Sequence, residues 1–104
     1  MAASTDILAI QSVMEAYFQG LHRADSTQLG RVFHQDATYV NATSGDYMNN
    51  DMKTYFSIID TRTSPEDLGE ALSGEILSVE FGGETMAFVK ARMTMLARDY
   101  TDFL

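Results

Sequence analysis

The sequence predicts an α+β fold in which three helices pack on the concave side of a curved antiparallel sheet. Two observations lead to this prediction. Apolar residues recur with a helical period over most of the first half of the chain, and three β-rich runs follow between Gly74 and Leu104. Helices followed by a group of strands are typical of the α+β class. The chain has 104 residues, so we expect one domain over residues 1–104.

The longest helix is predicted to begin near Ser4, Thr5 or Asp6, each of which offers an oxygen that caps a first turn. It should end at residues 22–24. Spacings of three and four place its apolar residues on one stripe: Ile7, Ile10, Val13, Met14, Tyr17, Phe18 and Leu21. Gly20 lies within this pattern at a cost of about 1 kcal/mol relative to alanine, so we expect another element to pack closely against it.

Two shorter helices are predicted in the middle of the chain. Asp25 or Ser26 caps the first of them, and Asn50 or Asp51 caps the second. The apolar positions are Leu29, Val32 and Phe33 in the first helix, and Met52, Tyr55, Phe56 and Ile59 in the second. Both helices are therefore expected to bury one side.

Four strands are predicted, one at Thr38–Asn41 and three in the meander at the end of the chain. The small polar segment Ala42–Asn50 contains a glycine and predicts either a loop or a loose hairpin. Short breaks at Gly82–Glu84 and Ala97–Asp99 separate the three runs of the meander. Antiparallel pairing of these runs follows from the shortness of the breaks.

The strand pattern predicts two apolar faces on the meander. Leu77, Val79 and Phe81 share one face of its first strand, since side chains alternate with a period of two. In the second strand both sets of alternate positions include apolar residues: Ala87, Val89, Ala91, Met93 and Met95 on one face, and Met86, Phe88 and Leu96 on the other. Helices can cover only one face, so we expect a partner chain in a homodimer to cover the other.

The charge of the chain excludes several classes of partner. Acidic residues number 15 against seven lysines and arginines, for a net charge of −8, and no basic cluster occurs. We therefore expect no nucleic-acid partner and no binding to an anionic membrane surface. Cysteine is absent, which excludes disulfides and thiolate sites. The first six residues do not form an export signal, so the sequence predicts a cytoplasmic protein.

Three motifs in order carry a resemblance to a known family. They are Tyr-Phe-x-Gly-Leu-x-x-x-Asp from residue 17, Phe-His-x-Asp-Ala from residue 33, and Gly-x-Thr-x-Ala-x-Val-x-Ala from residue 83. The chain resembles the nuclear-transport-factor-2-like superfamily over essentially its whole length, with the best match in the SnoaL-like and "putative lumazine-binding" branches. The resemblance implies a cone-like α+β barrel, a pocket between the long helix and the sheet, and a homodimer through the outer sheet face.

The sequence departs from this family at its end. Such domains commonly have another strand after the point where this sequence stops, at Asp102-Phe103-Leu104. A β-prone final segment without a neighbour is an aggregation hazard, so either the domain lacks its last strand or a partner covers this edge. We expect the first.

Four aromatic residues could form a ligand site. Histidine is the one residue type that titrates near neutrality without a large perturbation, so His34 could act as a general base or hydrogen-bond donor at a pocket mouth. Alternatively, His34 could hold the loop before the first strand. Tyr17, Tyr39 and Tyr55 come from separate elements and could converge on one cavity as ligand-binding residues. The alternative is that they are core aromatics whose hydroxyls reach the rim.

Arg92 and Asp102 form the other candidate group, because they are predicted on neighbouring strands within cross-strand reach. Carboxylates and an arginine inside the cone perform acid–base chemistry in related ketosteroid isomerases, polyketide cyclases and limonene epoxide hydrolases. A carboxylate in an apolar pocket has a raised pKa, which suits proton transfer by Asp102. An exposed ion pair worth less than about 1 kcal/mol is equally consistent with the sequence.

The sequence predicts neither a cofactor nor a metal, since it contains no phosphate loop, nucleophile elbow or metal-ligand cluster. The leading hypothesis is a pocket that binds a small hydrophobic or aromatic metabolite. The sequence leaves open whether the protein also catalyses an isomerase, cyclase or dehydratase reaction. The alternative is a non-catalytic homodimeric association module.

Overall fold

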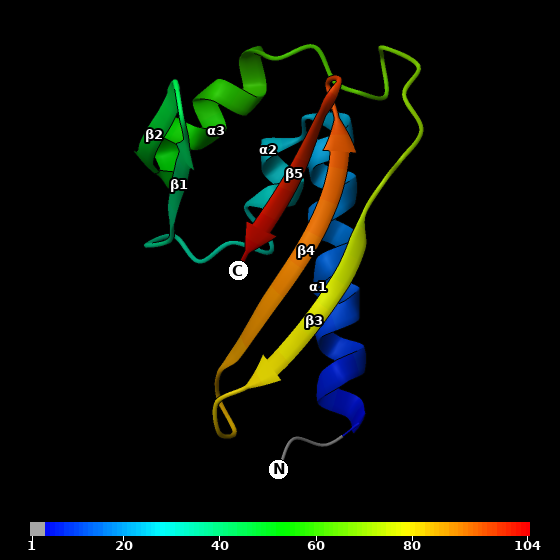
Figure 1. Ribbon diagram of the computed structural model, residues 1–104, viewed down its shortest axis with the longest axis vertical. Helices are drawn as coiled ribbons and strands as arrows, with labels where there is room; N and C mark the ends of the chain where they lie inside the picture. Colours follow the sequence, from blue (N-terminus) through cyan, green and yellow to red (C-terminus); the bar gives the residue numbers. More distant parts are fainter. Residues whose placement is uncertain (1–3) are drawn as a thin grey trace.

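A computed structural model of the protein describes residues 4–104. These residues have the predicted α+β composition, with three helices and two antiparallel sheets (Figure 1). In chain order the elements are α1 (Ser4–Arg23), α2 (Ser26–Leu29), β1 (Thr38–Thr43), β2 (Asp46–Asp51), α3 (Met52–Thr61), β3 (Glu75–Phe81), β4 (Ala87–Met95) and β5 (Arg98–Phe103). No helix within the described range is long and apolar enough to cross a membrane.

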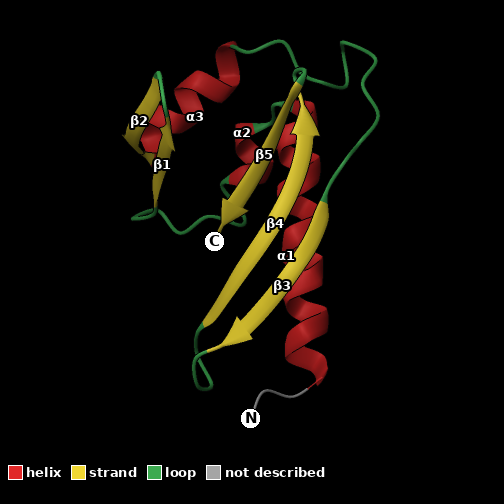
Figure 2. Cartoon of the chain, in the orientation of Figure 1, coloured by secondary structure: helices red, strands yellow, loops and turns green. Residues whose placement is uncertain are grey.

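The strands form two separate sheets. β3, β4 and β5 make the predicted antiparallel meander, and β1 pairs with β2 in a hairpin. Figure 2 shows α1 running along one side of the meander, while α3 lies beside the hairpin. α3 contacts both β1 and β2, so α3 and the hairpin pack together. The buried side chains of α1 and of β4 belong to one hydrophobic core cluster. Of the two alternatives for residues 42–50, the structure contains the hairpin, with Gly45 in its turn at φ 81°.

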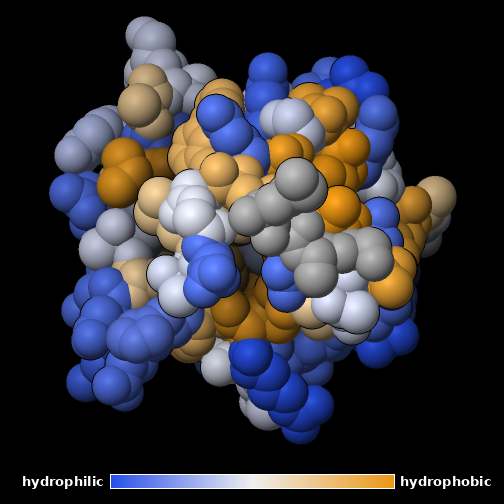
Figure 3. All heavy atoms as spheres, turned by 90° about the horizontal axis from the view of Figure 1, so that it is seen from below, coloured by the Kyte–Doolittle hydropathy of each residue, from blue (hydrophilic) through white to orange (hydrophobic). Residues whose placement is uncertain are grey.

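The apolar stripe of α1 is buried along its second half only. Met14, Tyr17, Phe18 and Leu21 are buried, whereas Val13 is 48% exposed. Hydrophobic surface is accordingly visible among polar residues at the end of the molecule where α1 begins (Figure 3). The predicted cap was wrong, because Ser4–Asp6 already lies within the first helical turn.

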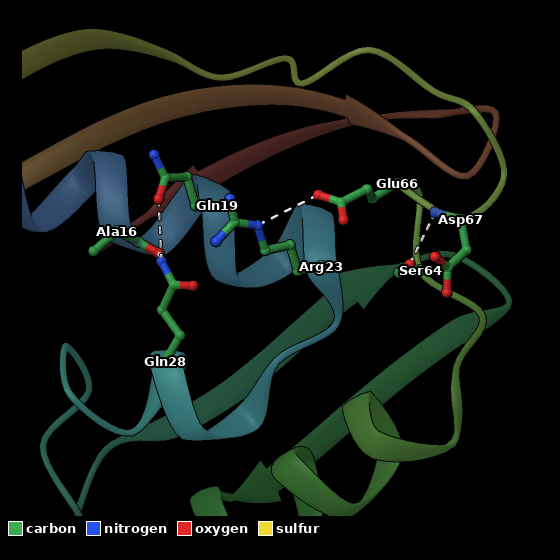
Figure 4. Close-up of polar contacts among 7 residues, drawn as sticks. All are labelled: Ala16, Gln19, Arg23, Gln28, Ser64, Glu66 and Asp67. Atoms are coloured by element: carbon green, nitrogen blue, oxygen red, sulfur yellow. Dashed lines mark hydrogen bonds and ion pairs between the residues drawn. The ribbon is translucent and has the colours of Figure 1, made fainter.

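Close packing explains the glycine in α1, as predicted. A Cβ atom on Gly20 would lie 2.7 Å from Cδ2 of Leu29, and Leu29 is fully buried. Only the absence of a side chain at Gly20 therefore allows α2 to approach α1 this closely. The side-chain amide of Gln28 adds a hydrogen bond to the Ala16 carbonyl at 3.1 Å (Figure 4).

Aspartates cap both shorter helices. The carboxylates of Asp25 and Asp51 accept hydrogen bonds from the backbone N–H three residues further on, at 3.1 Å and 2.9 Å. α2 is shorter than predicted and ends at Leu29. Val32 and Phe33 consequently lie in the turn after the helix, where they still pack against the core.

The connection between α3 and β3 lies against the end of α1. Glu66 forms an ion pair with Arg23 at 3.3 Å (Figure 4). The backbone N–H of Glu66 also donates to the His22 carbonyl at 3.0 Å. Further along, Gly74 passes so close to Phe18 that a Cβ atom at Gly74 would overlap the ring. These contacts hold the start of β3 on α1.

The meander differs from its prediction at two points. A β-bulge between Ile76 and Ser78 shifts the register, so Leu77 points away from the core and is 40% exposed. Its predicted alignment with Val79 was wrong, because a bulge inserts one unpaired residue and reverses the alternation. The break between β4 and β5 is also shorter than predicted, since only Leu96 and Ala97 separate the two strands.

The two faces of β4 are unequal. Val89, Ala91, Met93 and Met95 are buried against the core, as predicted for one face. On the outer face Phe88 stacks on Phe103 of β5, with ring centroids 5.6 Å apart. The remaining outer residues of β4 are Lys90, Arg92 and Thr94. The apolar part of the outer face is therefore confined to its aromatic end.

Candidate functional site

The candidate site is a cavity of about 850 Å³ between α1, β1 and the meander. Its walls are mostly apolar and come from elements far apart in the sequence: Val13 and Tyr17 of α1, Phe33 after α2, Tyr39 of β1 and Val89 of β4. An apolar cavity of this size with a few polar groups is typical of a small-molecule site.

The inner end of the cavity contains a hydrogen-bonded pair. The Tyr17 hydroxyl donates to Oδ2 of Asp102 at 2.7 Å. Burial raises the pKa of the Asp102 carboxyl, and the hydrogen bond from Tyr17 offsets part of that rise. Burial and the negative charge of Asp102 raise the pKa of Tyr17 well above its ordinary value. The pair can therefore present a neutral phenol beside a carboxyl that takes up a proton more readily than an exposed aspartate.

Tyr39 and Tyr55 stack beside this pair. Their ring centroids are 4.3 Å apart and their planes differ by 11°. Burial raises the pKa of both hydroxyls, so both phenols are neutral at physiological pH. Tyr39 lines the cavity, whereas Tyr55 lines a smaller chamber of about 20 Å³ at its inner end. The structure thus brings the three predicted tyrosines and Asp102 together.

His34 lies at the rim of the cavity, and its side chain is 73% exposed. Its Nδ1 atom accepts a hydrogen bond from the Asp36 backbone N–H at 3.0 Å, and the Asp36 carboxylate lies 3.8 Å away. This contact fixes the turn that leads into β1, which is the structural role weighed for His34. The opposite edge of the ring remains accessible from solvent, so a role at the cavity mouth stays a prediction.

Arg92 lies apart from the other predicted site residues. Ala91, and not Arg92, is directly opposite Asp102 in the β4–β5 register, so Arg92 projects from the outer face. There its guanidinium pairs with Glu75 of β3 at 3.0 Å, and both side chains are exposed. Arg92 does not line the cavity. The cross-strand ion pair considered for Arg92 exists, with a partner on the other neighbouring strand.

Sequence reasoning did not identify two residues of the inner chamber, Tyr100 and Arg62. Tyr100 could have been found, because it precedes Asp102 by two positions on the same strand and therefore shares its face. Arg62 follows the last residue of α3. No periodicity in the sequence indicates the direction of a residue just after a helix end.

The cavity is bordered by strand edges as well as by strand faces. All six residues of β1 line it, and so do consecutive residues of β5 from both of its faces. Within residues 4–104, β1 pairs only with β2 and β5 pairs only with β4, so each has one unpaired edge. Val40 and Phe103 are exposed here, which leaves this side of the cavity open to solvent.

The donor atoms around the cavity do not make a metal site. Within residues 4–104 no group of three or more histidines or carboxylates is arranged to hold a metal ion. The polar groups at the inner end are instead phenols, one carboxyl and one guanidinium, which suit hydrogen bonds to an organic ligand.

Comparisons with known proteins agree with the predicted resemblance. A family model described as "Putative lumazine-binding" matches residues 5–104. An NTF-2-like protein of unknown function from Silicibacter pomeroyi DSS-3 is 23% identical with a TM-score of 0.80, over 100% of this chain and 84% of that one. Another from Shewanella baltica OS155 is 22% identical with a TM-score of 0.75, over 95% of this chain and 78% of that one. No curated protein matches. The chain belongs to the putative lumazine-binding family and has the fold of NTF-2-like proteins.

Proposed function

We propose that the protein binds a planar, weakly polar small molecule in the cavity. The observation that carries the proposal is the Tyr17–Asp102 hydrogen bond at the inner end of a mostly apolar space. A buried phenol and carboxyl can orient the polar edge of a ring system, while Val13 and Val89 contact its faces. The description of the family as lumazine-binding supports a pteridine-like ring as the first ligand to test.

Proton transfer to or from the bound molecule is an extension of this proposal. Asp102 is the preferred proton-handling group because burial raises its pKa towards neutrality. His34 is the second candidate, since it lies at the mouth of the same cavity. Without a ligand, Tyr17 would hold the Asp102 carboxyl in place through their hydrogen bond. When a ligand binds, the Tyr17 hydroxyl would donate to a ligand oxygen in place of Asp102.

Titration with lumazine tests the binding proposal. We expect quenching of lumazine fluorescence on binding, and weaker binding by Tyr17→Phe and Asp102→Asn. Val13→Trp should block the cavity, because Val13 lines it. Leu8→Trp is the matched control on the same helix, since Leu8 is 63% exposed and does not line the cavity. Equal binding by both tryptophan variants would show that the ligand binds elsewhere.

We further propose that the last strand expected from the family resemblance pairs with the free edges of β1 and β5. Val89 of β4 and Leu104 exchange two backbone hydrogen bonds, and such hydrogen-bonded pairs occur at every second residue of an antiparallel ladder. The backbone N–H and C=O groups of the residues between them, Asp99, Thr101 and Phe103, therefore point away from β4. A strand added there would join the two sheets and close the open side of the cavity. The inner end around Tyr17 and Asp102 would remain as the ligand site.

Homodimeric association is the second candidate function. The observation that favours it is the stacked pair Phe88 and Phe103 on the outer face, which are 51% and 61% exposed. The Lys90 ammonium lies 5.8 Å from the Phe103 ring centroid and borders this aromatic patch. Exposed aromatic residues surrounded by charged ones are typical of protein–protein contacts. A cytoplasmic location and the absence of a nucleic-acid partner stay predictions from the sequence.

A further inference from the structure

Arg62 is the only arginine or lysine among the described residues that line the cavity or its inner chamber. The inner chamber of about 20 Å³ shares Tyr17, Tyr39, Tyr100 and Asp102 with the main cavity. The two spaces are therefore adjacent, and Arg62 borders the smaller one. Arg62 lines the chamber together with Tyr39 and Tyr55, and its charge opposes the rise in the pKa of both hydroxyls.

The guanidinium of Arg62 has no ion-pair or hydrogen-bond partner within residues 4–104, although the side chain is half-buried. Three other arginines have carboxylate partners: Arg23 with Glu66, Arg92 with Glu75 and Arg98 with Asp46. An arginine without a protein carboxylate beside it can pair with an anionic group of a ligand. Its planar donors match the two oxygens of a carboxylate or a phosphate.

The size of the inner chamber restricts what can reach Arg62. At about 20 Å³ it is far smaller than the main cavity of about 850 Å³, so only a terminal group of a ligand can enter it. A planar carboxylate is smaller than a tetrahedral phosphate and therefore suits this chamber better. The apolar body of the ligand would remain in the main cavity between Val13 and Val89.

We infer that Arg62 is a specificity-determining residue that binds the carboxylate of an apolar aromatic acid whose ring lies in the main cavity. This inference rests on the proposed small-molecule function and adds the class of ligand. Asp102 borders the same chamber, and its carboxyl can donate a hydrogen bond to the ligand carboxylate when it is protonated. The burial that raises the pKa of Asp102 favours that form.

A matched pair of probes tests the inference. 2-Naphthoate and 2-naphthamide have the same ring and differ in charge at one end. By calorimetry we expect the wild-type protein to bind the naphthoate roughly tenfold or more tightly than the amide, as hydrogen bonds to a charged group predict. Arg62→Gln should remove this preference and leave binding of the amide within about threefold of wild type. Arg62→Lys should retain part of the preference.

Arg92→Gln is the control variant, because Arg92 is paired with Glu75 on the outer face and does not line the site. It should leave both dissociation constants unchanged. Equal binding of the two probes by the wild-type protein, or a preference that survives in Arg62→Gln, would overturn the inference while the cavity remains a binding site. Failure of the wild-type protein to bind either probe or lumazine would overturn the proposed function, and the inference with it.

Discussion

The hydroxyl of Tyr17 and the carboxylate of Asp102 form a 2.7 Å hydrogen bond between residues 85 positions apart in the chain. The contact joins the second half of α1 to the last strand of the meander, where the cavity adjoins the inner chamber. Both groups are withdrawn from water, and their titration is therefore coupled to folding.

Asp102→Asn should change how stability depends on pH. Aspartate in an unfolded chain ionises near its ordinary pKa of about 3.9, whereas burial raises the pKa of Asp102 in the folded state. Between these two pKa values the folded state holds more protons, so the free energy of unfolding falls as pH rises. The variant lacks this titration and should gain stability relative to wild type as the pH rises above about 3.9 in urea unfolding. Tyr17→Phe should extend the fall to higher pH, because it removes the hydrogen bond that favours the ionised form. A pH-independent difference between Asp102→Asn and wild type would contradict the expected titration.

Gly20→Ala should destabilise the protein even though alanine favours helices. The helix gains about 1 kcal/mol from the substitution. The new Cβ atom would lie 2.7 Å from Leu29 Cδ2, however, and overpacking of a fully buried residue costs about 1–3 kcal/mol. Thermal unfolding of the single variant measures the balance. In a Leu29→Ala background the clashing atoms are absent, and Gly20→Ala should become stabilising. A Gly20→Ala penalty that persists there would mean that another neighbour is responsible.

Ala97→Gly should stabilise the turn between β4 and β5. Leu96 and Ala97 have φ values of 52° and 61°, in the left-handed region that costs an L-residue about 1–2 kcal/mol. Glycine adopts this conformation freely, and its greater freedom in the unfolded chain offsets part of the gain. We expect a net gain of about 0.5–1 kcal/mol in the free energy of unfolding. Ala87→Gly, within β4, serves as the control and should destabilise. Equal effects at both positions would argue against strain in the turn.

Phe88→Lys should weaken self-association if the outer sheet face forms a homodimer. The substitution places a charge beside Phe103 and Lys90 in the exposed aromatic patch. Sedimentation velocity should show a dimer for the wild-type protein at micromolar concentration and a smaller sedimentation coefficient for the variant. Leu72→Lys is the control, since Leu72 is 50% exposed in the connection before β3. A monomeric wild-type protein would exclude this association.

Thr101→Pro should block strand addition at the edge of β5 without breaking the β4–β5 ladder. The Thr101 N–H points away from β4, so proline removes a donor only from the free edge. In hydrogen exchange, an added strand peptide such as Lys-Thr-Val-Thr-Val-Thr-Val-Lys should protect the amides of Asp99 and Phe103. The variant should lose that protection. Protection that is unchanged in Thr101→Pro would place the peptide elsewhere.

The sequence by itself determined the elements and most of the core. Apolar residues spaced with a period of 3.6 identified α1 and α3, and a period of two identified the meander. An element that buries one side repeats its apolar residues regularly, whichever element it packs against. Local chemistry predicted Asp25 and Asp51 as caps, since a cap depends only on the next few residues. The close approach at Gly20 was also predictable, because a glycine costs a helix stability unless packing requires it.

Tertiary structure decided which side chains meet. The β-bulge at Leu77 depends on pairing with β4 and leaves no periodic signal, so it reversed the predicted face. The register of β4 and β5 placed Ala91 opposite Asp102 and sent Arg92 to the outer face, a choice that a one-residue shift would have inverted. Arg62 enters the site only because α3 packs on the hairpin. Contacts between distant segments depend on the packing of whole elements, and a local pattern contains no information about it.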